Sequence, residues 1–118
     1  MKNLPLAAVL LWLATGAAAH APEVVDVRAT QTGETWRFDV TIAHEETGWD
    51  DYADGWEVID AEGNQLGVRP LAHPHENEQP FTRSQSGIVI PDGTTEVYVR
   101  VRDNVNGWYE TRYPVPLK

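Results

Sequence analysis

Apolar and polar residues alternate along most of this chain, and this period of two constrains its fold more than any other feature. Every second residue of 36–42 is apolar, with Arg37, Asp39 and Thr41 between them. Such alternation is typical of a strand with one buried face. Residues 97–101 repeat the pattern. We predict weaker strands at residues 24–30, 56–60, 65–71, 81–90 and 108–115.

Turn-forming segments separate these strands, and no stretch has the period of an amphipathic helix. Seven short strands in a chain of this length are typical of two antiparallel sheets packed face to face. The chain has no cysteine, so the prediction depends on strand number and spacing and not on a disulfide framework. We therefore predict an all-β fold, a seven-stranded sandwich of the immunoglobulin or fibronectin type III kind.

The start of the chain has the layout of an export signal. Lys2 supplies a positive charge, and an almost unbroken apolar run follows at residues 4–13. Small side chains at Ala17 and Ala19 then suit a signal peptidase. We predict that residues 1–19 are a cleaved signal peptide.

Cleavage there leaves His20 as the first residue of a single domain at 20–118, and a cut after Ala18 is also allowed. The apolar run of the signal is too short for a stable membrane span, so we expect no membrane insertion. Because the chain has no cysteine, we also expect no lipid anchor. The predicted location is periplasmic or secreted.

The charge of the chain limits its partners. The formal net charge is −9, and removal of Lys2 with the signal leaves eight basic residues against eighteen acidic ones. Nucleic acids and anionic membranes are bound through clustered basic residues, so neither is an expected partner. A metal ion or another exported protein remains compatible with this charge.

The direction of the predicted strands gives the histidines a common location. Successive strands of an antiparallel sandwich run in opposite directions, so successive connections alternate between its two ends. By this count, the mature N-terminus and the two long connections, residues 44–55 and 72–80, fall at one end. That end holds all four histidines of the chain: His20, His44, His73 and His75.

The same end is acidic, with six carboxylates and no basic residue from His44 to Glu57. Imidazoles beside carboxylates attract a divalent cation, and imidazole-rich sets favour copper, zinc or nickel over calcium. We therefore take the four histidines as candidate metal ligands. Asp51 or Asp54 would orient the histidine rings through hydrogen bonds without binding the metal themselves.

His20 is the expected anchor of this site. A histidine at the start of a chain can chelate a metal through its α-amine and its ring together, and the amine has an ordinary pKa of about 7.7–8.0. One or two further imidazoles complete the nitrogen-rich set that copper(II) prefers. Zinc(II), or no metal, is the alternative. His73 and His75 form a second candidate pair, because residues two apart in an extended segment point the same way.

These features resemble the CopC-type periplasmic copper-binding proteins, whose mature chains begin His-Ala, as His20 and Ala21 do here. The resemblance implies a small exported β-sandwich whose terminal histidine helps to hold copper(II), for copper storage, delivery or tolerance. The family's Asp-X-His pair has no match, because residues 102–104 read Arg-Asp-Asn, and its Met-rich copper(I) motif is missing. Residues 73–84 also look like a segment of small uncharacterised bacterial exported proteins.

A metal-free binding module is the competing prediction. Trp49, Tyr52 and Trp108 fall in or beside the long loops, where aromatic rings can stack on a sugar or contact a peptide or protein partner. Arg83 and the histidines would then serve as hydrogen-bonding groups. The chain has no cysteine nucleophile, and no Ser-His-Asp spacing favours hydrolysis, so we predict no catalytic activity.

Overall fold

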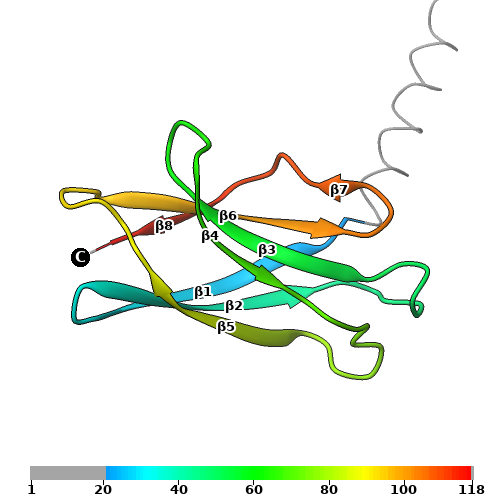
Figure 1. The fold of residues 1–118 in the computed structure, drawn as a ribbon. Helices are drawn as coiled ribbons and strands as arrows, with labels where there is room; N and C mark the ends of the chain where they lie inside the picture. The colour runs from blue at the N-terminus through cyan, green and yellow to red at the C-terminus, as the bar shows by residue number, and fades with distance from the viewer. Residues whose placement is uncertain (1–20, 118) are drawn as a thin grey trace, which may run out of the picture.

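The structure is a computed structural model, and it describes residues 21–117. These residues form two antiparallel sheets that face each other, without a helix among them (Figure 1). Their strands are β1 (Glu23–Thr32), β2 (Thr35–Ala43), β3 (Ala53–Ile59), β4 (Gln65–Pro70), β5 (Phe81–Ile88), β6 (Glu96–Asp103), β7 (Gly107–Trp108) and β8 (Tyr113–Pro116). One sheet has the order β1-β2-β5. In the other, β3 lies between β4 and β6, and β6 also pairs with β7 and β8.

The predicted all-β sandwich is confirmed, with eight strands in place of seven. The difference arises at the predicted strand 108–115, which is divided into β7 and β8. Both pair with β6, but the four residues 109–112 stand opposite only two, Arg100 and Val101. The surplus residues leave the ladder as a bulge. The bulge is held where the Tyr109 amide donates to the carbonyl of Val101 at 3.0 Å.

The core lies between the two sheets and follows the alternation of the sequence. Phe38, Val40 and Ile42 of β2 have no exposed surface. They belong to one hydrophobic cluster with residues of the opposite sheet that include Trp56 and Val99. Full burial of such a side chain stabilises the fold by about 1.5–3 kcal/mol relative to exposure. The apolar positions that predict the strands are therefore also the positions that form the core.

Gly67 of β4 allows a close approach between the two sheets. A Cβ atom at this position would lie 2.8 Å from both Cδ1 and Cγ1 of Ile88, at the end of β5. Glycine is required here for lack of space, since its backbone does not adopt a positive φ. The contact joins an edge strand of one sheet to an edge strand of the other.

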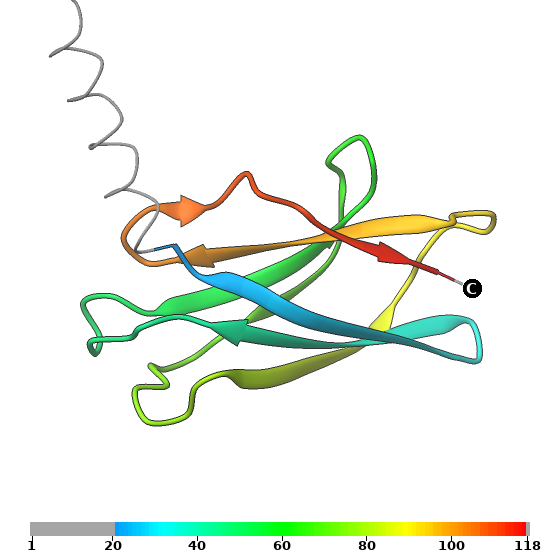
Figure 2. The ribbon, with the colours of Figure 1, turned by 180° about the vertical axis from the view of Figure 1, so that it is seen from behind.

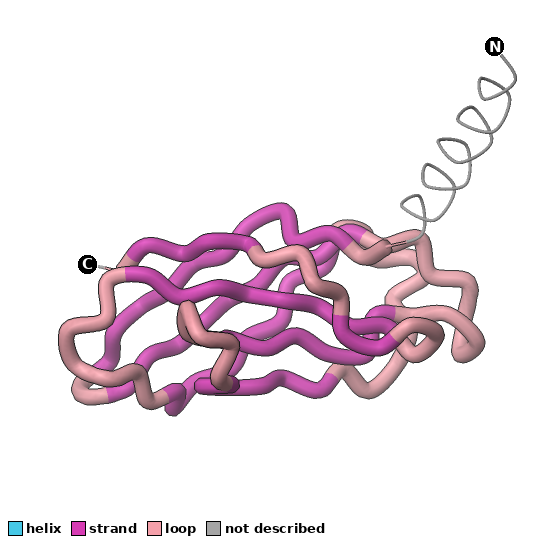
Figure 3. Tube along the Cα trace, turned by 90° about the horizontal axis from the view of Figure 1, so that it is seen from above, coloured by secondary structure: helices cyan, strands magenta, loops and turns pink. Residues whose placement is uncertain are grey.

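Most of the connections lie at the two ends of the sandwich, as the views from behind and from above show (Figures 2 and 3). We call one end the site pole; it contains the start of β1 and the loops 44–52, 71–80 and 104–106. The opposite pole contains the turn at 33–34 and the connections 60–64 and 89–95.

Three of the four histidines, His44, His73 and His75, lie in loops of the site pole. His20 and the predicted signal peptide at 1–19 lie outside the described residues. Within residues 21–117 there is no helix with the length and apolar character needed to cross a membrane.

Candidate metal site

His44 and Glu46 form a buried pair in the loop that follows β2. Nδ1 of His44 lies 3.0 Å from Oε2 of Glu46, and the two side chains are 3% and 0% exposed. The same Oε2 accepts a hydrogen bond of 2.7 Å from the amide of Ala53. An ionised carboxylate can only accept, so this contact assigns the ring proton to Nδ1 and makes Nε2 the nitrogen that can bind a metal.

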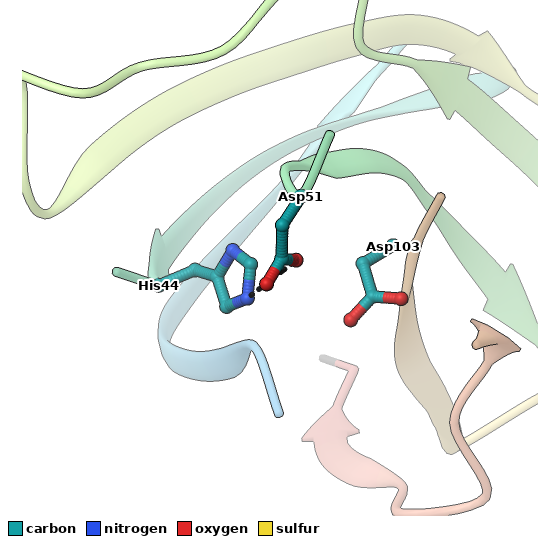
Figure 4. A group of neighbouring side chains, drawn as sticks. All are labelled: His44, Asp51 and Asp103. Carbon is teal, nitrogen blue, oxygen red and sulfur yellow. Dashed lines mark ion pairs between the residues drawn. The ribbon is translucent and has the colours of Figure 1, made fainter. Parts of the chain in front are cut away.

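Nε2 of His44 is directed toward two aspartates. It lies 3.8 Å from Oδ1 of Asp51, and one ligand atom each from His44, Asp51 and Asp103 lie within 4.8 Å of one another. Figure 4 shows the three side chains converging from different elements, with the His44–Asp51 contact dashed. Because His44 follows β2 and Asp103 ends β6, the cluster bridges the two sheets at the site pole.

Asp103 is held rigidly in this cluster and is 1% exposed. Its Oδ1 accepts from the amides of Val105 at 3.1 Å and Asn106 at 2.7 Å. Its Oδ2 accepts from the hydroxyl of Tyr109 at 2.6 Å. Burial, followed by this hydrogen bond, raises the pKa of Tyr109 above its ordinary value, so the phenol remains a donor at neutral pH.

The cluster is rich in negative charge. Three carboxylates, those of Glu46, Asp51 and Asp103, surround the single imidazole of His44. Within residues 21–117, no arginine or lysine nitrogen makes an ion pair with any of these carboxylates. Burying a carboxylate is costly unless a partner offsets its charge. A divalent cation bound among them would supply that charge.

The loop 71–80 supports the cluster through the backbone. Oε1 of Glu46 accepts from the amide of His75 at 2.6 Å. The side chain of Gln79 accepts from the amide of His44 at 2.9 Å and donates to the carbonyl of His75 at 2.9 Å. Glu46 and Gln79 thus tie the two long loops of the site pole together. This gives a structural role to part of the segment 73–84.

The ring of His75 packs into the protein and does not join the cluster. It stacks on Phe81, with ring centroids 4.0 Å apart and planes at 12°. Both ring nitrogens are buried without a hydrogen-bond partner. Nδ1 is 3.7 Å from Oε1 of Glu46. Burial, with smaller effects from Arg83 and His73, lowers the pKa of His75, so its ring is neutral near pH 7.

Two other predicted residues also lie apart from the cluster. His73 is exposed, and its Nδ1 lies 3.1 Å from the carbonyl of Pro74. Its ring is 4.7 Å from that of His75, so the two rings are close, as expected for residues two apart. Oδ1 of Asp54 accepts from Nε of Arg102 at 2.8 Å and therefore balances an arginine instead of orienting a histidine.

The aromatic residues of the competing prediction are placed as follows. Trp49 is 65% exposed and meets Tyr52 edge to face, with centroids 5.6 Å apart. Trp108 is packed beneath the guanidinium groups of Arg100 and Arg102, at 5.9 and 5.5 Å. Arg83 pairs with Glu78 at 3.0 Å. Among these four residues, Trp49 is the one whose large apolar side chain is exposed.

From the sequence, Glu46 counts among the acidic groups of this end, but neither Glu46 nor Asp103 is assigned to the site. A local signal existed for Glu46, since the pattern His-X-Glu places a carboxylate beside a histidine in a loop. For Asp103 the signal was its position just after the strand predicted at residues 97–101, which runs toward the end that holds the histidines. The structure places Asp103, together with His44 and Asp51, in the cluster.

No protein-family model matches the chain, so the resemblance to the CopC-type proteins is without support from that comparison. In sequence, the chain is similar to a "Putative lipoprotein" of Halomicrobium mukohataei, with 44% identity over 86 residues. The match covers 72% of this chain and 42% of that protein. The chain thus spans less than half the length of this relative.

In structure, the chain is similar to a hypothetical protein of Pyrococcus horikoshii OT3, with a TM-score of 0.54 and 13% identity over 84% of this chain and 88% of the other. This likeness supports the fold alone. A superoxide reductase in the oxidised state matches over 84% of this chain and 88% of its own, with a TM-score of 0.49 and 16% identity. A likeness at that level says nothing about activity here.

Proposed function

We propose that this chain is an exported protein that binds a divalent transition metal at the site pole. Nε2 of His44 is the imidazole ligand, and Asp51 and Asp103 supply carboxylate oxygens. One observation carries the proposal: Glu46 holds the Nδ1 side of His44, so that Nε2 is directed to the aspartates. Histidines that bind metals are usually held by a carboxylate or carbonyl at the other nitrogen in this way.

Export is supported by two independent features. The first twenty residues have the pattern of a signal peptide. The similar protein of Halomicrobium mukohataei is named a lipoprotein, which is a class of exported protein. A periplasmic or secreted location is the finer part of the proposal.

Copper(II) is the proposed metal, with zinc(II) as the alternative, and the preference depends on His20. Glu23 pairs with Ala43, the residue before His44. Three residues span at most roughly 11 Å, so the α-amine of a mature chain that begins at position 20 would be within reach of this loop. The amine and two imidazoles, together with the two aspartate carboxylates, form the nitrogen-rich set that copper(II) favours. The proposed role is copper storage, delivery or tolerance, without catalysis.

Titration of the mature protein beginning at His20 with copper(II) and with zinc(II), followed by calorimetry, tests the site. Asp51→Asn removes a ligand, and Asp50→Asn makes the same charge change at an exposed neighbour. We expect one-to-one binding that Asp51→Asn weakens at least tenfold and Asp50→Asn leaves nearly unchanged. Equal affinities in the two variants, or no binding, would overturn the proposal. One extra residue before His20 tests the anchor separately, with loss of the preference for copper expected.

A metal-free binding role is the second candidate, and the exposure of Trp49 favours it. The carbonyl of Trp49 accepts from Asn104 at 2.8 Å, and the amide of Tyr52 donates to the same Asn104 side chain at 2.9 Å. These bonds hold the backbone of the loop that carries the exposed indole, and such preorganisation favours recognition of a sugar, peptide or protein. Binding that survives a chelator and is lost in Trp49→Ala would support this role over the metal site.

A further inference from the structure

A cleft lies at the opposite pole, away from the candidate metal site. Its volume is about 720 Å³, within the range of roughly 300–1,000 Å³ that is usual for small-ligand sites. It is bounded by the β1–β2 turn, by the connection 89–95 and by Leu117 near the end of β8. Trp36 and Ile90 contribute further apolar surface, and Val89 is 66% exposed beside them.

Among the described residues, the charged side chains that line this cleft are acidic. Glu34 and Asp92 both line it and are exposed. No arginine, lysine or histidine is among its lining residues in the described part of the chain. The two carboxylates attract a cation through their charge, and the indole of Trp36 adds aromatic surface beside them.

The walls of the cleft are preformed by backbone structure. Gly33 and Gly93 adopt positive φ values of 64° and 86°, which allow the two tight turns on either side. The amide and hydroxyl of Thr94 both donate to the carbonyl of Pro91, at 3.2 and 2.7 Å. The amide of Leu117 donates to the carbonyl of Thr95 at 2.8 Å. A ligand therefore meets an arrangement that needs little ordering on binding.

We propose that this cleft binds an alkylammonium group, from either a free polyamine or a lysine side chain of a partner protein. The methylene chain would contact Trp36 and Leu117, and the ammonium group would pair with Glu34 or Asp92. An apolar stem with a charged end matches this combination of surfaces. The site is independent of the metal site and would operate in metal-free protein.

Calorimetry and NMR on the mature, chelator-treated protein test the cleft, with spermidine as the polyamine and N-acetyl-lysine methylamide as the side-chain probe. Physiological salt limits unspecific attraction to the acidic surface. The indole N–H signal of Trp36, assigned from Trp36→Phe, reports on the cleft itself. Glu34→Gln with Asp92→Asn removes its charge. Glu45→Gln with Asp50→Asn is the matched control at the site pole, and triethylene glycol is the neutral control ligand.

We expect saturable binding of at least one probe that moves the Trp36 signal and weakens at least tenfold in the cleft variant alone. Binding of spermidine only identifies a free polyamine, and binding of the lysine derivative only identifies a partner side chain. Equal weakening in both double variants, equal binding of triethylene glycol, or no movement of the Trp36 signal would overturn the proposal.

Discussion

The carboxylate of Glu46 lies 3.0 Å from Nδ1 of His44 and has no exposed surface. It also accepts from the amides of Ala53 and His75, at 2.7 and 2.6 Å. One buried side chain therefore fixes the tautomer of the candidate ligand and joins both long loops of the site pole. The stability of this pole and its affinity for a metal should depend on the same group.

Glu46→Gln should lower both the stability of the site pole and its affinity for a metal. Both carboxylate oxygens of Glu46 accept hydrogen bonds from buried N–H groups. A glutamine has only one oxygen, so its NH2 group would face one of these N–H donors. A buried polar group left unpaired costs about 1–3 kcal/mol, and we expect a loss of that size in the free energy of unfolding from urea denaturation. Glu45→Gln, at an exposed neighbour, should change it by less than about 0.5 kcal/mol. Equal effects of the two substitutions would contradict the role of Glu46.

Two arginine–carboxylate pairs should contribute very differently to stability. Arg100 contacts Glu57 through Nε at 2.9 Å and a terminal nitrogen at 2.7 Å, and Glu57 is 3% exposed. Arg100→Ala leaves that carboxylate buried without its cation, which costs about 3–5 kcal/mol. Arg83→Ala breaks a solvent-exposed pair with Glu78 and should cost about 0–1 kcal/mol. Thermal or urea unfolding of both variants decides the matter, and similar losses would show that Glu57 does not depend on Arg100.

Gly67→Ala should destabilise the sandwich by overpacking. The added methyl group would lie 2.8 Å from Cδ1 of Ile88, and overfilling a packed core costs about 1–3 kcal/mol. Gly55→Ala is the matched control, because its nearest contacts, 3.2 Å to Cγ and 3.4 Å to Cδ, are with the side chain of Arg102. The carbonyl oxygen of Arg69, at 3.5 Å, is at an ordinary contact distance. Ile88→Val removes Cδ1 and should reduce the additional loss caused by Gly67→Ala. Wild-type stability of Gly67→Ala would show that the two sheets separate easily there.

His75 should make the protein less stable in acid. Burial lowers the pKa of His75 in the folded state below its ordinary 6.5, as Arg83 and His73 also do, against the opposing charges of Glu46 and Glu78. Below about pH 6.5 the unfolded chain therefore binds a proton that the folded protein does not. The free energy of unfolding has no such contribution above that pH and falls as the pH decreases toward the folded-state pKa.

His75→Phe should weaken this dependence while keeping the stacking contact with Phe81. Urea denaturation at pH 7, 6 and 5 measures it, with His73→Gln as the exposed control. We expect the wild type and His73→Gln to lose more stability between pH 7 and pH 5 than His75→Phe does. Parallel losses in all three proteins would assign the acid sensitivity to other groups.

The sequence predicted the strands well where the information is local. Residues 36–42 and 97–101 lie within β2 and β6, because side-chain alternation is a property of each strand by itself. The prediction of one strand at 108–115 was wrong at its centre. The bulge at 109–112 depends on how many residues of β6 stand opposite, and a single segment does not encode that number.

The site was predictable in its location more than in its composition. Strand parity brings His44, His73 and His75 to one end, but it does not set the direction of their rings. His75 turns inward because Phe81, from the next strand, offers a stacking surface. Asp103 lies near His44 only because the two sheets face each other, which brings the end of β6 close to the loop after β2. These contacts between different sheets cannot be read from spacing along the chain.

The coordination of copper(II) by His44 is the central claim, and pulsed EPR of the copper-loaded mature protein tests it most directly. A copper-bound imidazole gives a characteristic modulation from its remote nitrogen. We predict modulation from two imidazoles, His20 and His44, in the wild type and in His73→Gln, and from only one in His44→Gln, with circular dichroism to confirm that this variant folds. The same two-imidazole signal in His44→Gln, or no imidazole signal in the wild type, would contradict the account.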